Sequence, residues 1–225
     1  VQSGQLRTLA NRQSLSSPRL VEHLRRHQEL MLSHTGNLAS HKPASMEFPC
    51  FSPNALSDPL VADWERFMES EYEAPEPVRK VMVLLPCSAR KPYRLSKSHG
   101  QFFRAINSTG CHEVMMTSPL GLVPRDLEDV WPASNYDVPV TGDWTADELA
   151  RVRRMLASLV KRTGYQRVIN HTGMDLSFLD VEVVNTREGQ GATNYDALAR
   201  LSAAVKDAKT IYELRNQKNN LRLKQ

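Results

Sequence analysis

Cysteine is scarce in this 225-residue sequence, and the three cysteines are widely spaced. Cys50, Cys87 and Cys111 form no CxxC pair, which disfavours both a disulfide framework and a structural zinc site. His23 and His27 lie one helical turn apart, but HLRRH lacks the glutamate and the third ligand of a helical metal site. The GxGxxG and GxxxxGK[ST] fingerprints are absent too. We therefore predict no metal and no cofactor.

The sequence also lacks a long apolar run. No stretch approaches the roughly 18 consecutive apolar residues that cross a bilayer, and the first residues do not form a signal peptide. We therefore predict a cytoplasmic protein without a membrane partner. The chain opens on Val1 without an initiator methionine, which we interpret as the sign of either a piece of a longer polypeptide or a processed chain.

Acidic residues are missing from one long segment. Hydrophobic residues make up 40% and charged residues 24% of the chain, which predicts a folded domain, and the net charge is only +4. Residues 79–104 nevertheless contain seven basic residues and no acid. Such a segment suits a polyanion such as RNA, although a solvated basic face would look the same. The basic residues are Arg79, Lys80, Arg90, Lys91, Arg94, Lys97 and Arg104.

The chain divides into two parts. Residues 1–45 predict a helical segment, with one helix from about 18 to 32, followed by a linker rich in serine, proline and asparagine. Residues 46–225 predict a single α/β domain of ordinary size.

Short apolar runs alternate with helical patterns in this second part. The runs at 81–86, 112–117, 165–170 and 181–186 predict strands, and amphipathic helices are expected between them and from about Tyr195. Residues 119–140 are rich in proline and read as a long irregular segment. The expected fold is a three-layer α/β sandwich, in which helices flank a mostly parallel sheet.

In such sheets, ligands bind at the carboxyl ends of the strands. This rule selects three segments, which are PCSARKPY after the first strand, TSPLG after the second and NHTGMD after the third.

Residues 86–99 read PCSARKPYRLSKSH, with Pro-Cys, three residues, Lys-Pro-Tyr, two residues, Ser, two residues and His. This pattern resembles the signature that separates archaeosine synthases from ordinary tRNA-guanine transglycosylases. Residues 118–144 and WERF at 64–67 are also similar to this family. Residues 4–25 resemble the helical tail of the transglycosylase-like domain in its longer members.

The resemblance implies that lysine is added to the nitrile of 7-cyano-7-deazaguanine in the tRNA D-loop. It implies tRNA and free lysine as partners, with a radical-SAM lyase that releases archaeosine from the adduct. The transglycosylase-like domain and the RNA-binding PUA domain of the longer members are expected on other segments or other chains.

The nitrile carbon could be attacked by a thiolate, and an amine could then displace the resulting thioimide. Cys87 is the candidate nucleophile, because nearby cations and a helix N-terminus would lower the pKa of its thiol. A buried structural cysteine is the alternative. Lys91, in the same motif, is a further candidate catalytic residue. His99 is a candidate general base, a phosphate ligand or a structural residue.

Other side chains are candidates for binding. Ser96 is either a plain helix cap or, with Ser98, part of an anion site. Tyr93 either stacks on a base or packs in a loop. An acid should face the lysine ammonium, and Asp175 and Asp143 are the first choices. The candidate substrate-binding residues are Ser88, Tyr93, Ser96, Ser98, Asp143 and Asp175, and the candidate RNA-binding residues are Arg90, Arg94, Lys97 and Arg104.

Two other interpretations remain open. A catalytically silent subunit could bind tRNA and present it to a separate transglycosylase or lyase, in which case it would not need the thiol of Cys87. The sheet could also form a base pocket like that of the uracil-DNA glycosylases, which is an analogy of fold alone.

Overall fold

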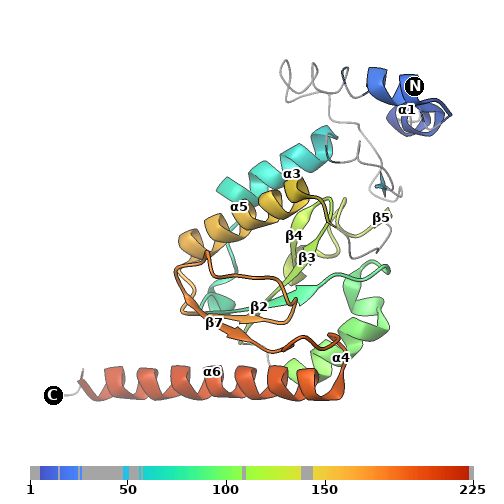
Figure 1. Cartoon of the computed structure of the whole chain (residues 1–225). Coiled ribbons are helices and arrows are strands. Elements are labelled where there is room, and N and C mark those ends of the chain that lie inside the picture. The colour runs from blue at the N-terminus through green and yellow to red at the C-terminus, as the bar shows by residue number, and fades with distance from the viewer. Residues whose placement is uncertain are drawn as a thin grey trace.

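A computed structural model gives the arrangement of the chain (Figure 1). The structure describes residues 6–14, 16–24, 26, 48–50, 56, 58–107, 110–137 and 144–222. Helix α1 spans Leu6–Ser14, and residues 18–24 are also helical, which confirms the predicted helical N-terminal segment. The remainder of the helix predicted to reach residue 32, and the boundary predicted near residue 45, lie outside the described residues.

A five-stranded sheet forms the centre of the fold. Its strand order is β4 (Gly121–Pro124), β3 (His112–Thr117), β2 (Val81–Pro86), β6 (Arg167–Asn170) and β7 (Glu182–Asn185). The last four of these strands run parallel, whereas β4 is antiparallel to β3. Strand β2 is buried on both faces because it is central, which explains its uninterrupted apolar sequence. The predicted mostly parallel sheet is confirmed.

Helices cover both faces of this sheet. Figure 1 shows α3 (Pro59–Ser70) and α5 (Ala146–Thr163) on one face, and α4 (Lys97–Ile106) and α6 (Tyr195–Arg222) on the other. The predicted three-layer sandwich is therefore confirmed, while the likeness to uracil-DNA glycosylases stays a prediction. In the described part of the chain, no helix has the length and apolar character needed to cross a membrane.

The helices begin and end where the sequence signals lie. Asp58 and Ser96 cap α3 and α4, each accepting a hydrogen bond from a backbone amide of the first turn. Thr145 and Glu148 form the expected capping box of α5, and that helix ends at Gly164, which has a positive φ of 71°. These local contacts fix the helix termini before any tertiary packing is considered.

The prediction for residues 119–140 was wrong in part. The segment contains strand β4, the 3-10 helix η4 (Arg125–Leu127) and the two-residue strand β5 (Tyr136–Asp137). Gly121 takes a φ of 74° that suits glycine, which lets the chain reverse and pair β4 with β3. Four residues ending in a proline are too few to show an alternating pattern, so the sequence hid this strand.

A second, smaller sheet lies beside the first. Strand β1 (Phe48–Pro49) pairs in parallel with β5, and Phe48 is aligned with Tyr136. The pairing matters for the site because it fixes the position of Tyr136, whose side chain is almost fully buried.

Candidate functional site

The candidate site is centred on Cys87, directly after β2. Its backbone N–H donates to the carbonyl oxygen of Met116 at 3.1 Å, which continues the pairing of β2 with β3. The side chain is half-buried, and the carboxyl ends of the parallel strands meet at this edge. The strand-end rule thus placed the thiol where a ligand crevice is expected.

Burial raises the pKa of the Cys87 thiol above its ordinary value, although a hydrogen bond with Thr117 and the charge of Lys91 act in the opposite direction. The predicted lowering of this pKa was therefore wrong in its net sign. Desolvation of the thiolate outweighs the positive charge that the motif supplies. The charge of Lys91 does lower the pKa of the thiol, as expected, but burial has the larger effect.

Three buried hydroxyl groups are connected beside the thiol. Thr117 Oγ1 and the Tyr136 hydroxyl lie 2.5 Å apart, and the Tyr136 hydroxyl in turn bonds the Tyr93 hydroxyl. All three side chains are at most 2% exposed. Lys91 Nζ lies 4.2 Å from the centroid of the Tyr136 ring, in a cation–π contact. Cys87, Lys91 and these hydroxyls form one group, which we call the thiol cluster.

Tyr93 is fully buried, and its ring packs 5.2 Å from the His99 ring. Burial raises the pKa of its phenol. In this structure the ring offers no exposed face to a nucleobase, so the loop-packing interpretation describes Tyr93 better than base stacking does.

His99 is also buried, at 1% exposure. Its Nδ1 lies 3.1 Å from a guanidinium nitrogen of Arg125, which can only donate. The other ring nitrogen, Nε2, therefore carries the hydrogen and donates to the carbonyl oxygen of Pro86 at 3.1 Å. Burial and the nearby Arg125 lower the pKa of His99 to about 3. The imidazole is therefore neutral, and both of its nitrogens have a hydrogen-bond partner. Of the three roles that the sequence allowed for His99, this arrangement fits the structural one. The hydrogen bond to its carbonyl oxygen holds Pro86, the residue that precedes Cys87, in place.

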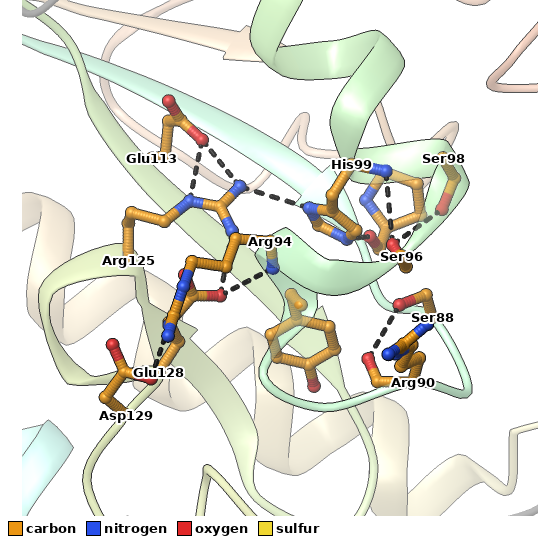
Figure 2. Close-up of polar contacts among 12 residues, drawn as sticks. Ser88, Arg90, Arg94, Ser96, Ser98, His99, Glu113, Arg125, Glu128 and Asp129 are labelled. Carbon is orange, nitrogen blue, oxygen red and sulfur yellow. Dashed lines mark hydrogen bonds and ion pairs between the residues drawn. The ribbon is translucent and has the colours of Figure 1, made fainter.

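Arg125 links His99 to two buried carboxylates (Figure 2). Its guanidinium donates to Glu113 at 2.6 and 2.9 Å and to Glu128 at 2.9 Å. Glu128 also accepts from the backbone N–H of Arg94 at 3.1 Å. This ionic cluster braces the turn that follows Cys87.

The serines and the first arginine of the motif lie at its rim. Figure 2 shows Ser88 donating to the carbonyl oxygen of Arg90 at 3.1 Å, and Ser96 accepting from the His99 backbone amide at 3.2 Å. Ser98 Oγ lies 3.2 Å from Ser96 Oγ. The capping interpretation of Ser96 is confirmed, and anion binding by Ser96 and Ser98 stays a prediction.

The candidate RNA-binding residues all lie on the surface. Arg90, Arg94, Lys97 and Arg104 are exposed, the last two on α4. Arg94 forms ion pairs with Asp129 and Glu128, which neutralise part of its charge. Arg90, Lys97 and Arg104 remain the better candidates for contacts with phosphates.

A groove of about 380 Å³ lies at the carboxyl ends of β6 and β7. Asn170, in its wall, pairs with Leu84 of β2, three residues before Cys87. Three residues of strand span about 10 Å, so the groove and the thiol share one edge of the sheet. Its lining residues are Asn170, Gly173, Met174, Asp175, Asn185, Arg187, Glu188 and Gly189.

Asp175 is exposed in this groove, and the backbone N–H of Ser177 lowers the pKa of its carboxyl group. Asp143, the other predicted partner of an ammonium group, lies outside the described residues. His171, directly after β6, is fully buried and bonds Thr186 and the carbonyl oxygen of Ala192, and it does not line the groove.

No three His, Cys, Asp or Glu side chains converge as a metal site within the described ranges. His23 is exposed, and His27 lies outside those ranges.

Sequence reasoning missed two members of the thiol cluster. Thr117 lies in TSPLG, the segment that the strand-end rule selected after the second strand, so that signal was present but unused. Tyr136 is 49 residues from Cys87 in the chain and carries no motif. Its place in the site is visible only from the contacts of its hydroxyl with Thr117 and Tyr93.

Fold and site together define a three-layer α/β protein with a half-buried thiol at the carboxyl edge of a mostly parallel sheet. Residues 61–205 match the model of the family described as "Domain of unknown function (DUF5591)". The chain belongs to this family.

Curated relatives carry archaeosine synthase names. The archaeosine synthase of Methanocaldococcus jannaschii is 31% identical over 94% of this chain and 36% of its own length. Archaeosine synthase subunit alpha of Methanosarcina acetivorans is 37% identical over 67% of this chain and 25% of its length. Archaeosine synthase subunit alpha of Thermoplasma acidophilum is 38% identical over 58% of this chain and 26% of its own length. The resemblance stated from the motif is confirmed, and the chain spans about a quarter to a third of these relatives.

Proposed function

We propose that this chain is the part of an archaeosine synthase that adds lysine to the nitrile of 7-cyano-7-deazaguanine in tRNA. The position of Cys87 carries the proposal, since its thiol lies at the carboxyl edge of the sheet, beside Lys91 and along the same edge as an acidic groove. The archaeosine synthase names of the relatives support a role in this tRNA modification.

The chemistry proceeds in two balanced steps. The Cys87 thiol adds across the nitrile, so that a sulfur–carbon bond forms, one π bond of the nitrile breaks and the nitrogen gains the proton. The ε-amine of lysine then attacks the thioimide carbon. The carbon–sulfur bond breaks, the thiol takes back a proton, and an amidine remains on the base.

The groove is the proposed site for the free lysine. Asp175 supplies negative charge to an ammonium group, as does Glu188, which also pairs with Arg200 at 3.4 Å, and Arg187 lies beside them for a carboxylate. Arg187 Nη1 and Nε already bond the carbonyl oxygens of Thr172 and Gln190, which hold the guanidinium in place.

The tRNA is proposed to bind along the exposed cations Arg90, Lys97 and Arg104. The transglycosylase-like and PUA domains of the longer members and a radical-SAM lyase are proposed as partners, and no cofactor is needed for the steps above. A catalytically silent tRNA-binding subunit is the second candidate, which the same exposed cations favour.

The test is nucleoside mass spectrometry with isotopically labelled lysine and tRNA that contains 7-cyano-7-deazaguanine, with the two additional domains supplied in trans. We expect a labelled adduct from the wild type and from Cys111→Ala, which alters a buried cysteine away from the site. Cys87→Ala is expected to form none. If the wild type forms no adduct although it binds the tRNA, the silent subunit is the better account.

A further inference from the structure

We propose that the hydroxyls of Tyr93, Tyr136 and Thr117 form a one-way hydrogen-bond chain that ends on the Cys87 sulfur and holds it ready for attack. The inference rests on the proposed function of Cys87 as nucleophile, and it assigns positioning roles to Thr117 and Tyr136.

The three hydroxyls are connected in series and shielded from water. The Tyr93 hydroxyl contacts the Tyr136 hydroxyl, which lies 2.5 Å from Thr117 Oγ1. Thr117 follows Met116, whose carbonyl oxygen accepts from the Cys87 backbone N–H, so the strand pairing places Thr117 beside the thiol. A hydrogen bond from Thr117 to the sulfur would lower the pKa of Cys87. Buried hydroxyls seldom lack partners, because an unsatisfied one costs free energy. Here each hydroxyl is satisfied mainly by the next member of the chain.

The proposed direction of the chain follows from counting which groups can donate a hydrogen and which can accept one. Each hydroxyl donates one hydrogen, and a thiolate only accepts. With Tyr93 donating to Tyr136 and Tyr136 to Thr117, the Thr117 hydrogen is left for the sulfur or for the carbonyl oxygen of Ser118, which is 3.4 Å away. A charged sulfur is the stronger acceptor of the two. In the opposite direction, the Thr117 hydrogen would go to Tyr136 and none would be left for the sulfur, so the direction of the chain is what the Thr117→Val variant tests.

Separate elements fix the members of the chain. Thr117 ends β3 next to β2, whose Pro86 is aligned with Met116. Tyr136 is held by the pairing of β1 with β5, and Tyr93 begins the 3-10 helix η3 (Tyr93–Leu95). The hydroxyls are therefore placed before the substrate arrives, as preorganised stabilisation of charge requires.

Lys91 acts on the same sulfur in a different way. Its ammonium group lies over the Tyr136 ring and favours the thiolate through charge, not through the hydroxyl chain. Thr117→Val removes the hydrogen bond and keeps the charge, so the two contributions can be separated by variants.

The experiment measures the rate at which iodoacetamide alkylates Cys87 in the 225-residue chain from pH 6 to pH 11, read by mass spectrometry of the Cys87 peptide. We expect Thr117→Val to move the profile to higher pH by about one unit, the order expected for one hydrogen bond to a charged group. Thr117→Ser keeps the hydroxyl and is expected to restore the wild-type profile. Tyr136→Phe is expected to produce a smaller shift in the same direction.

Matched controls separate this proposal from a loss of folding and from the proposed function. Tyr72→Phe removes a buried phenol hydroxyl from another part of the molecule and is expected to leave the profile unchanged. Superimposed profiles of Thr117→Val and the wild type would overturn the chain, and so would equal shifts for Thr117→Val and Thr117→Ser. If Thr117→Val does not fold, Thr117→Ser and Tyr136→Phe decide the matter. The assay needs no tRNA or lysine, so its outcome is independent of whether Cys87→Ala abolishes adduct formation.

Discussion

Strand β3 carries a buried polar cluster at each of its ends, and the two clusters use similar side chains. At the carboxyl end, the Thr117 hydroxyl bonds the Tyr136 hydroxyl, which bonds that of Tyr93, beside Cys87. At the amino end, His112 lies between the hydroxyls of Tyr72 and Tyr165, and Tyr72 also bonds Asp126. We call this second group the histidine cluster.

The hydrogen bonds of the histidine cluster are all made between its own members. The Tyr72 hydroxyl donates to Asp126 at 2.9 Å, so Nε2 of His112 donates to the Tyr72 oxygen at 2.9 Å, and Tyr165 donates to Nδ1. Every hydrogen ends on an acceptor within the cluster, and the charge of Asp126 is stabilised there. The thiol cluster instead lies beside Cys87 at the crevice edge, where we propose that its hydroxyl chain ends on the nucleophile. The comparison teaches that similar side chains serve folding at one end of a strand and, as we propose, chemistry at the other.

The largest expected effect comes from substituting Arg125. This residue follows β4 at the end of the sheet that carries the histidine cluster, and its guanidinium contacts the His99 ring. Arg125→Met leaves the buried carboxylate of Glu113 without its cation and removes the nearer of the two cations that pair with Glu128, while Arg94 stays 3.6 Å away. We expect the free energy of unfolding to fall by about 3–5 kcal/mol, measured by urea denaturation. Arg94→Met is the matched control, because Arg94 is exposed and its ion pairs with Asp129 and, at 3.6 Å, with Glu128 each contribute at most about 1 kcal/mol. Equal effects of the two variants would contradict this account.

The next effect depends on pH. The pKa of His99 in the folded chain is lowered to about 3, while the unfolded chain binds a proton near pH 6.5. Stability from neutral His99 is therefore fully present above pH 6.5 and is lost as the pH falls toward 3. We expect His99→Gln to remove about 2 kcal/mol of the decline between pH 6.5 and pH 5. Urea denaturation at each pH measures it, and an identical slope in both proteins would contradict the neutral, buried imidazole.

A matched pair of variants sharpens the comparison of the clusters. Tyr72→Phe and Tyr136→Phe each remove one buried phenol hydroxyl, and each is expected to cost about 1–2 kcal/mol of unfolding free energy. Only Tyr136→Phe should also slow the alkylation of Cys87 at a fixed pH. A change of Cys87 reactivity in Tyr72→Phe would show that the two clusters are coupled and would break the comparison.

The smallest effect concerns Ser96, whose side chain caps α4. Ser96→Ala is expected to lower the free energy of unfolding by about 1 kcal/mol, and Ser96→Asp, which keeps a capping oxygen, should restore most of it. Weaker tRNA binding by Ser96→Asp than by Ser96→Ala, measured by filter binding, would be consistent with an anion site at this helix terminus. Equal binding would leave Ser96 as a cap alone.

Much of the fold could be predicted because its signals are local. Strand β2 reads as an apolar run since both of its faces are buried, and α5 carries its own capping box and terminal glycine. Strand β4 escaped prediction because it is short and is defined by its pairing with β3. The two-residue strands β1 and β5 likewise exist only through each other.

The candidate site was predicted less completely than the fold. The motif and the strand-end rule located Cys87, but the direction of its pKa shift depends on burial, which a sequence does not display. The sequence left both a functional and a structural role open for His99 and Tyr93, and their burial in the core favours the structural one. Tyr136 comes from a distant segment and required the structure.

The most direct test of the account is to trap the first covalent intermediate. The 225-residue chain is incubated with 7-cyano-7-deazaguanine in the absence of any amine, and its intact mass and peptides are measured. We predict an increase equal to the mass of the base, located on Cys87, absent in Cys87→Ala and reversed by added lysine. Adduct on another residue, or labelled lysine transfer to tRNA by Cys87→Ala at the wild-type rate, would contradict the claim that Cys87 attacks the nitrile.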